Sequence, residues 1–166
     1  MSTKSTQTST AAKLNGMPGA QDAIAMLTEE HREVSDMFEQ FENLSDRAKA
    51  TKAKLTEKIC NALIAHTTIE EEIFYPAVRE AVKDEDMIDE AVVEHASAKD
   101  LIAQIREMSP EDDLYDAKVK VLSEMIDHHV EEEEKEMFPK TRKLKLDMGV
   151  LGEEMKKRQE EIEAAM

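Results

Sequence analysis

Four long stretches of the chain carry apolar residues at intervals of three and four positions. This spacing gives an α-helix one apolar face and one polar face. Short polar segments join the stretches, so we expect an all-α protein, an up-down-up-down four-helix bundle. The four predicted helices are residues 21–43, 47–82, 87–108 and 109–146.

Signals at the helix ends refine this pattern. Ser109-Pro110-Glu111-Asp112 combines a Ser cap, a Pro at the first helical position and acidic residues in the first turn, which predicts a helix start. Pro76 lies inside the second stretch and should kink or loosen the helix there. Gly149 and Gly152 interrupt the pattern before a short helix over 153–165, which could pack across the bundle, contact a partner or fray.

The two ends of the chain are expected to differ from the bundle. Seven of the first ten residues are Ser or Thr, a composition that buries too little apolar surface to fold. We therefore expect a disordered tail over residues 1–19, the bundle over 20–146 and a C-terminal helix or tail over 147–166. The N-terminal tail lacks the Arg residues and the amphipathic stripe of a targeting peptide.

Charge and composition narrow the classes of function. The net charge is -16, from 38 acidic and 22 basic residues, which argues against binding to nucleic acid or to an anionic membrane. No apolar run has the length of a membrane span or of a signal peptide. The single cysteine, Cys60, excludes an internal disulfide, is expected to be a small buried apolar residue, and favours the cytoplasm.

Each predicted helix places one histidine within its apolar stripe, and two helices add a glutamate one turn later. Six ionisable groups in one dry core would destabilise the fold unless a counter-ion balanced them. A bound metal would turn their burial into stabilisation. These candidate ligands are His31, His66, Glu70, His95, His129 and Glu133.

Two segments of the chain repeat the same arrangement, residues 66–76 and 129–139. In each, a His is followed by Glu at the fourth and fifth positions, large apolar residues at the eighth and ninth, and Pro at the tenth. A His and a Glu four residues apart lie on one helix face. The second and fourth helices of such a bundle are diagonal and run in the same direction, so the two copies should face each other.

The ligand types limit the metal. Imidazoles and carboxylates without thiolate suit Fe, Zn, Mn or Co. Six ligands with internal two-fold symmetry fit two metals better than one, each held by two imidazoles with both carboxylates bridging. The Glu-x-x-His pattern of ferritin-like di-iron proteins is absent.

Neighbouring residues leave alternatives open. Alignment of the two copies on Pro76 and Pro139 selects His129 as the ligand and makes His128 a flanking residue. Glu71 and Glu134 recur in both copies and either support the ligands or belong to a solvated face. Tyr75 and Phe138 are expected in the apolar core. Tyr75 should not be a ligand, because the fifth position after Glu70 points off the ligand face of an α-helix.

The His-bearing first helix, the two His-x-x-x-Glu copies and Glu94-His95 resemble the hemerythrin-like, HHE cation-binding family, over about residues 22–145. The resemblance implies a non-haem centre of two iron ions with an oxo or hydroxo bridge, and O2 or peroxide as exogenous ligand. It implies that the six candidate residues are the iron ligands. Oxygen carriers of this family have a further His four residues after the one on the third helix. Here that position is Lys99, and the freed position could hold water, peroxide, Glu71 or Glu134.

Several functions fit this centre. The first is binding of O2 or related small molecules for storage, sensing or detoxification, and the second is an enzyme acting on peroxide or nitric oxide. The third is iron or other cation homeostasis, in which metal binding acts as a signal by changing the stability of the protein. The fourth is a purely structural bundle. The expected partners are small molecules (O2, peroxide, NO), with no nucleic acid and no membrane, and a homodimer is left open.

Overall fold

The protein is described here by a computed structural model of residues 21–83 and 85–166, in which no strand occurs. The predicted tail over residues 1–19 lies outside these described residues. Two of the helices are interrupted by π-helical turns, η1 and η2. In chain order the elements are α1 (Ala23–Glu42), α2 (Lys49–Ile69), η1 (Glu70–Phe74), α3 (Tyr75–Ala81), α4 (Asp86–Arg106), α5 (Tyr115–Glu132), η2 (Glu133–Met137), α6 (Phe138–Arg142) and α7 (Met148–Ala164).

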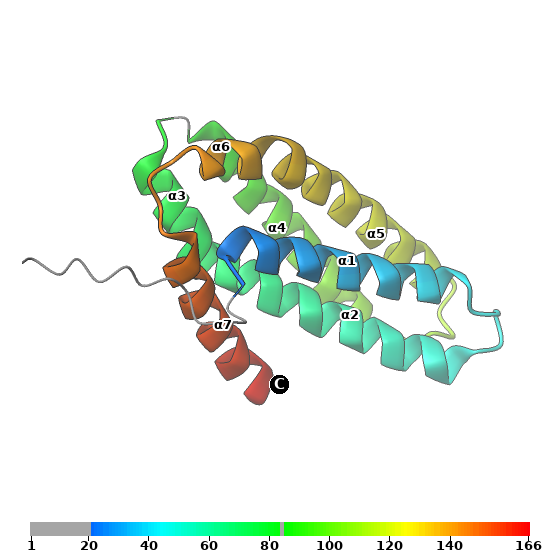
Figure 1. Ribbon diagram of the computed structural model, residues 1–166. Helices are drawn as coiled ribbons and strands as arrows, with labels where there is room; N and C mark the ends of the chain where they lie inside the picture. The colour runs from blue at the N-terminus through cyan, green and yellow to red at the C-terminus, as the bar shows by residue number, and fades with distance from the viewer. Residues whose placement is uncertain (1–20, 84) are drawn as a thin grey trace, which may run out of the picture.

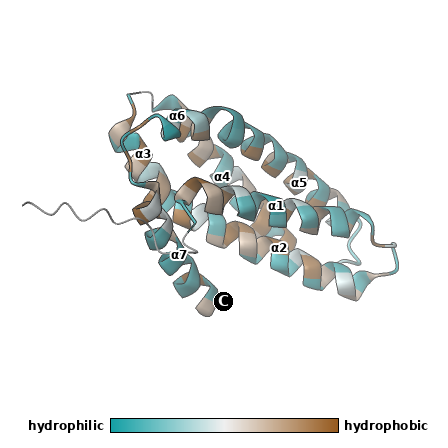
Figure 2. Cartoon of the chain, viewed as in Figure 1, coloured by the Kyte–Doolittle hydropathy of each residue, from teal (hydrophilic) through white to brown (hydrophobic). Residues whose placement is uncertain are grey.

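The four long helices lie side by side as a bundle (Figure 1). Helix α1 contacts α2 and α5, and α4 contacts the same two helices. The helices α2 and α5 are therefore diagonal, and the predicted all-α, up-down-up-down bundle is confirmed. The hydropathy colouring in Figure 2 alternates between teal and brown along the long helices, as expected for helices with one apolar face.

The predicted loosening at Pro76 is confirmed and takes the form of a π-helical turn. Helix α2 continues through η1 into α3 without a loop, and Pro76 stands in the first turn of α3. The backbone N–H of Tyr75 donates to the carbonyl of Glu70, five residues earlier. The second copy has the same arrangement. The turn η2 precedes Pro139, and the N–H of Phe138 donates to the carbonyl of Glu133. A proline lacks the N–H that an α-helix needs, and the wider turn accommodates it.

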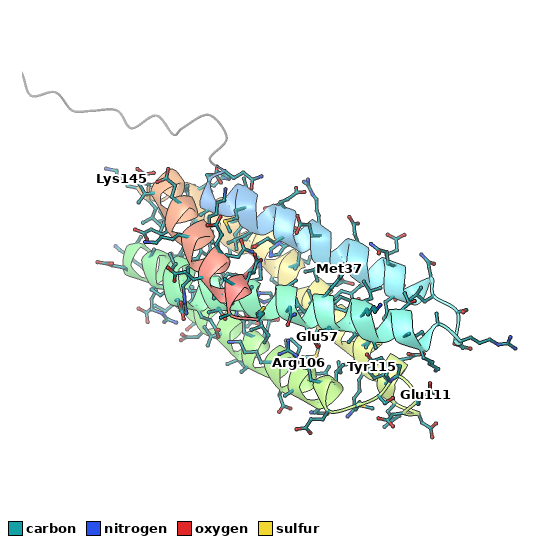
Figure 3. All side chains as sticks on the ribbon, turned by 90° about the horizontal axis from the view of Figure 1, so that it is seen from below. Met37, Glu57, Arg106, Glu111, Tyr115 and Lys145 are labelled. Atoms are coloured by element: carbon teal, nitrogen blue, oxygen red, sulfur yellow. The ribbon has the colours of Figure 1, made fainter. Side chains whose placement is uncertain are left out.

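The predicted start of the fourth long helix is wrong by six residues. Helix α5 begins at Tyr115, and Ser109 belongs to a turn, because side chains there bond to the nearby backbone. The N–H of Ser109 donates to Oδ2 of Asp112 at 2.9 Å, and the N–H of Glu111 donates to Oγ of Ser109 at 3.2 Å. Such local bonds compete with helix formation. Figure 3 labels Glu111 and Tyr115 at this end of the bundle, opposite Lys145.

The C-terminal helix is longer than predicted and includes both glycines. Asp147 caps α7 by accepting from the N–H groups of Gly149 and Val150, each at 3.1 Å. Gly152 lies against the backbone before α1, where an added Cβ would stand 2.5 Å from the carbonyl oxygen of Gln21. The helix packs on α1, α2 and η1, which answers the question left open by the sequence.

Two apolar clusters fill the bundle, one on each side of a polar layer. The first gathers residues of α1, α2, η1, α3, α4, η2, α6 and α7 around Leu27, Phe74 and Met155. The second gathers residues of α1, α2, α4 and α5 around Phe38, Ile59 and Leu122. Cys60 is a free thiol buried in the second cluster, as predicted. Within the described part of the chain, no helix combines the length and apolarity that crossing a bilayer requires.

Candidate metal centre

The structure brings all six candidate ligands together in the polar layer between the two apolar clusters. The first and third long helices, α1 and α4, contribute one histidine each, and the two interrupted helices contribute a histidine and a glutamate each. None of the six is more than 6% exposed. They are His31, His66, Glu70, His95, His129 and Glu133.

One half of the layer lies between α1 and α2. The Nε2 atoms of His31 and His66 are 3.2 Å apart. Oε1 of Glu70 lies 2.5 Å from Nε2 of His66, and Oε2 of Glu133 lies 3.2 Å from Nε2 of His31.

The other half lies between α4 and α5. The Nε2 atoms of His95 and His129 are 3.0 Å apart. Oε1 of Glu133 lies 3.1 Å from Nε2 of His129, and Oε1 of Glu70 lies 4.0 Å from Nε2 of His95. Glu70 and Glu133 thus belong to both halves, and within each half the four ligand atoms lie within 4.8 Å of one another.

This arrangement fits two cations better than a metal-free core. Two nitrogens that bind one ion at roughly 2.0–2.1 Å lie within about 4.2 Å of each other, and both His–His pairs meet this limit. Neither oxygen of Glu70 has a hydrogen-bond donor in suitable geometry, although the side chain is fully buried. An unsatisfied buried carboxylate is costly, and a cation in each half would satisfy it.

A carboxylate stands behind two of the four imidazoles at hydrogen-bond distance. Glu30 lies 2.9 Å from Nδ1 of His66, and Glu94 lies 3.0 Å from Nδ1 of His129. A carboxylate at Nδ1 keeps the proton there and leaves Nε2 free to bind a metal. No role for Glu30 or Glu94 was predicted from the sequence. The signal was a Glu directly before the core histidine on both α1 and α4, since Glu30 precedes His31 and Glu94 precedes His95.

The other two imidazoles face carboxylates at longer range. Oε1 of Glu134 lies 3.7 Å from Nδ1 of His31, and Oε1 of Glu71 lies 3.8 Å from Nδ1 of His95. Lys99 forms an ion pair with Glu71. Both glutamates therefore lie on the Nδ1 side of the histidines and outside the two groups of converging ligand atoms, and neither forms a hydrogen bond with the imidazole that it faces.

The C-terminal helix reaches the site through one of these carboxylates. The side-chain amide of Gln159 on α7 donates to Oε1 of Glu30, whose other oxygen faces His66. Arg158 anchors the same helix by pairing with Glu72, at 2.7 Å from its Nε. Helix α7 therefore contacts the carboxylate that orients one candidate ligand, His66.

Tyr75 is buried in the first apolar cluster, as predicted, but its hydroxyl points into the site, whereas the sequence predicted a place off the ligand face. It donates a hydrogen bond to Oε1 of Glu133 and lies 3.2 Å from Nε2 of His95 and 3.5 Å from Nε2 of His129. In an α-helix the fifth residue after Glu70 would leave the ligand face. The π-helical turn has more residues per turn, so Tyr75 returns to that face.

The same position in the second copy holds Phe138, which has no hydroxyl. Its ring stacks on that of His31, with centroids 5.8 Å apart and an angle of 3° between the planes. The two halves of the site are therefore related by the internal repeat but differ at this position. The half that contains His95 and His129 has an additional oxygen, and this is also the half in which Lys99 replaces a histidine of the oxygen carriers.

His128 does not join the six ligands. Its side chain is 64% exposed and pairs with Glu132 at 3.2 Å and with Glu94 at 3.6 Å. Of the two adjacent histidines, His129 is thus the one that lies among the six candidate ligands.

Burial and mutual repulsion place protons in the metal-free site. Burial, followed by the nearby Glu133 charge, raises the pKa of Glu70 to about 8. Burial lowers the pKa of His129, but the hydrogen bond and charge of Glu133 outweigh it and leave the pKa at about 9. The pKa of His95 falls to about 3, through burial and then the charge of His129. At neutral pH an incoming cation must displace protons from Glu70 and His129.

Comparison with known proteins identifies the family of the chain. A protein named DNA nickase from Nostoc sp. is 30% identical over 118 residues, which are 71% of this chain and 32% of that protein. The chain thus spans about a third of the length of that relative. A solved hemerythrin HHE cation-binding domain-containing protein from Mycobacterium kansasii shares the fold, with a TM-score of 0.75 at 22% identity over 87% of this chain and 89% of that one. The hemerythrin HHE cation-binding domain matches residues 22–141, and the chain therefore belongs to that family.

Proposed function

We propose that the six buried residues bind two iron ions and that the resulting centre binds O2 or a related small molecule. The observation that carries this proposal is the pair of His–His contacts sharing Glu70 and Glu133, with both oxygens of Glu70 unsatisfied. Iron held by imidazoles and carboxylates supplies one-electron chemistry and affinity for small oxygen ligands.

The surrounding residues would orient the ligands and restrict water. Glu30 and Glu94 hold the protons of His66 and His129 at Nδ1 and present Nε2 to the metals. The apolar clusters pack on both sides of the site and limit the water that reaches it.

A cavity of about 440 Å³ offers a small molecule a way to the site. It lies between α1 and α5 and reaches His31, and Phe38, Ile126 and Val130 form part of its wall. An uncharged diatomic molecule needs little hydrogen bonding, so a partly apolar cavity of this kind suits it.

One observation favours a second function, catalysis on peroxide. The hydroxyl of Tyr75 brings a proton donor to Glu133 and to within 3.2 Å of Nε2 of His95. Cleavage of an O–O bond requires protons, whereas reversible binding of O2 does not need a dedicated donor.

We retain the cytoplasm as the expected compartment, in line with the free thiol of Cys60.

Metal content and the visible spectrum test this proposal. Protein loaded anaerobically with Fe²⁺ should hold about two irons per chain, and air should produce a new visible absorption band. Recovery of the starting spectrum when O2 is removed supports binding, whereas steady consumption of added peroxide supports catalysis. His66→Ala and His129→Ala should each abolish the band and any turnover. A chain that binds no iron, or two variants that keep the activity, would refute the proposal.

A further inference from the structure

An acidic groove runs between α4 and α5 from the surface to the candidate metal centre. Its cavity of about 200 Å³ has His129 and Glu133 among its lining residues. Every other ionisable residue of the lining is a carboxylate except Lys140. These carboxylates are Asp86, Glu90, Glu94, Glu132 and Glu136.

Three side chains converge as metal ligands do, and two of them, Glu94 and Glu132, line this groove. Nε2 of His128 lies 3.2 Å from Oε1 of Glu132 and 3.6 Å from Oε2 of Glu94. Each of the three offers one ligand atom, and these atoms lie within 4.8 Å of one another. The imidazole of His128 is 64% exposed, so a hydrated ion can reach it directly.

One residue joins this surface cluster to the buried centre. Glu94 faces His128 with Oε2, and its Oε1 bonds to Nδ1 of His129, one of the six candidate ligands, at 3.0 Å. The surface cluster is thus one side chain away from the second half of the centre, and the acidic groove opens on the same histidine.

We propose that Glu94, His128 and Glu132 form a surface site that captures a divalent cation and passes it along the acidic groove to the buried centre. The proposal rests on the proposed function, since it assumes that the centre binds metal. Three mixed ligands on an exposed surface leave most of the ion's coordination to water, which suits capture and release rather than permanent binding.

The charge of the other cavity at the centre supports this choice of route. The cavity between α1 and α5 is lined by Arg32 and Lys135 as well as by acidic residues. Positive side chains oppose the approach of a cation, whereas a cleft lined by one sign of charge concentrates the opposite ion and raises its association rate. The groove between α4 and α5 is therefore the cation route, and the other cavity remains for uncharged ligands.

The rate of metal uptake tests the proposal. Metal-free protein would be mixed with Co²⁺ at low ionic strength, and the visible absorption of bound Co²⁺ would be followed by stopped flow. The test variant carries His128→Asn and Glu132→Gln together, which leaves Glu94 and its bond to His129 in place. The control is Glu131→Gln, which removes the same negative charge from the neighbouring residue of α5, on the wall of the other cavity.

We expect the double variant to load about tenfold more slowly, at the low end of electrostatic steering effects, and to reach the same final two Co²⁺ per chain. Glu131→Gln should load at the rate of the unmodified protein. Equal rates in the double variant and the control would overturn the surface site. Failure of all three proteins to bind Co²⁺ would instead overturn the metal centre itself.

A second measurement detects the surface site directly. Protein whose buried centre is already filled would be titrated with Mn²⁺, and free Mn²⁺ would be measured by electron paramagnetic resonance. We expect one additional weak site in the unmodified protein and in Glu131→Gln, and none in the double variant. Absence of the weak site from the unmodified protein, or its persistence in the double variant, would contradict the proposal.

Discussion

The substitution Tyr75→Phe tests the most unexpected contact in the site. The π-helical turn η1 directs the Tyr75 hydroxyl to the buried carboxylate of Glu133. Phenylalanine keeps the ring and its packing against Phe74 and His95, whose centroids lie 6.1 and 5.3 Å from that of Tyr75. The internal repeat already has Phe138 at the equivalent position, so the change removes only the hydroxyl.

The magnitude follows from the partners of Glu133. A buried hydrogen bond to a charged group contributes about 1.5–3 kcal/mol. Glu133 keeps its contacts with His31 and His129, and the isosteric ring leaves no large cavity. We therefore expect the low end, a loss of about 1.5 kcal/mol in the free energy of unfolding of the metal-free protein. A chain of this length should then melt about 3–6 °C lower.

Urea unfolding of the metal-free protein, followed by circular dichroism, measures this loss. The matched control is Tyr115→Phe, which removes the hydroxyl of the other tyrosine, buried in the cluster farther from α7. A neutral hydrogen bond contributes about 0.5–1.5 kcal/mol, so the control should lose less. If Tyr75→Phe is as stable as the unmodified protein, or more stable than the control, the hydroxyl does not bond to Glu133 and the role assigned to η1 is wrong.

Four further outcomes are expected. Chelation of the metal should lower the melting temperature by several degrees, since ligand at 100 times its Kd stabilises by about 2.7 kcal/mol; equal melting curves would count against a buried centre. The pKa values of Glu70 and His129 are about 8 and 9, so both groups are protonated at pH 7. Calorimetry in buffers of different ionisation enthalpy should therefore show that Zn²⁺ binding releases protons. The affinity for Zn²⁺ should fall as the pH falls below 8. Gly152→Ala should destabilise the protein by about 1–3 kcal/mol, measured by urea denaturation, because the added Cβ overpacks against Gln21. The control is Gly149→Ala, whose Cβ would meet only a side-chain oxygen at 3.3 Å. It should change the free energy of unfolding by less than about 0.5 kcal/mol. The acidic chain should not nick supercoiled plasmid in a gel assay with Mg²⁺, and nicking activity would contradict the inference from charge.

The bundle and the six central side chains could be predicted because both depend on periodic spacing. The position of a residue within the repeat of a helical turn decides whether its side chain faces the core. His31 and His95 could therefore be placed in the interior from their apolar neighbours alone. The internal repeat likewise placed Glu70 opposite Glu133. No knowledge of loops or of side-chain conformation was needed for these assignments.

The predictions from the sequence failed where a tertiary contact or a change of helix type decided the structure instead of regular spacing. Gly152 looks like a helix breaker, but it is tolerated because the backbone at Gln21 needs the space of a missing Cβ. The segment that begins at Ser109 has the residue types of a helix cap. The hydroxyl and the N–H of Ser109 nevertheless form hydrogen bonds within a turn. Tyr75 was placed off the ligand face because the prediction assumed a uniform α-helix through η1.

The two π-helical turns make the number of residues in this part of the helix a constraint in its own right. An α-helix rotates by about 100° per residue, so one residue more or less changes the direction of every side chain that follows. Glu72 in η1 is exposed and pairs with Arg158 of α7. Its deletion would let η1 become α-helical and make Tyr75 the fourth residue after Glu70, so Tyr75 and Val78, both buried, would keep their directions. A deletion within α2, which holds no extra residue, would instead rotate every side chain of η1 and α3 by about 100°.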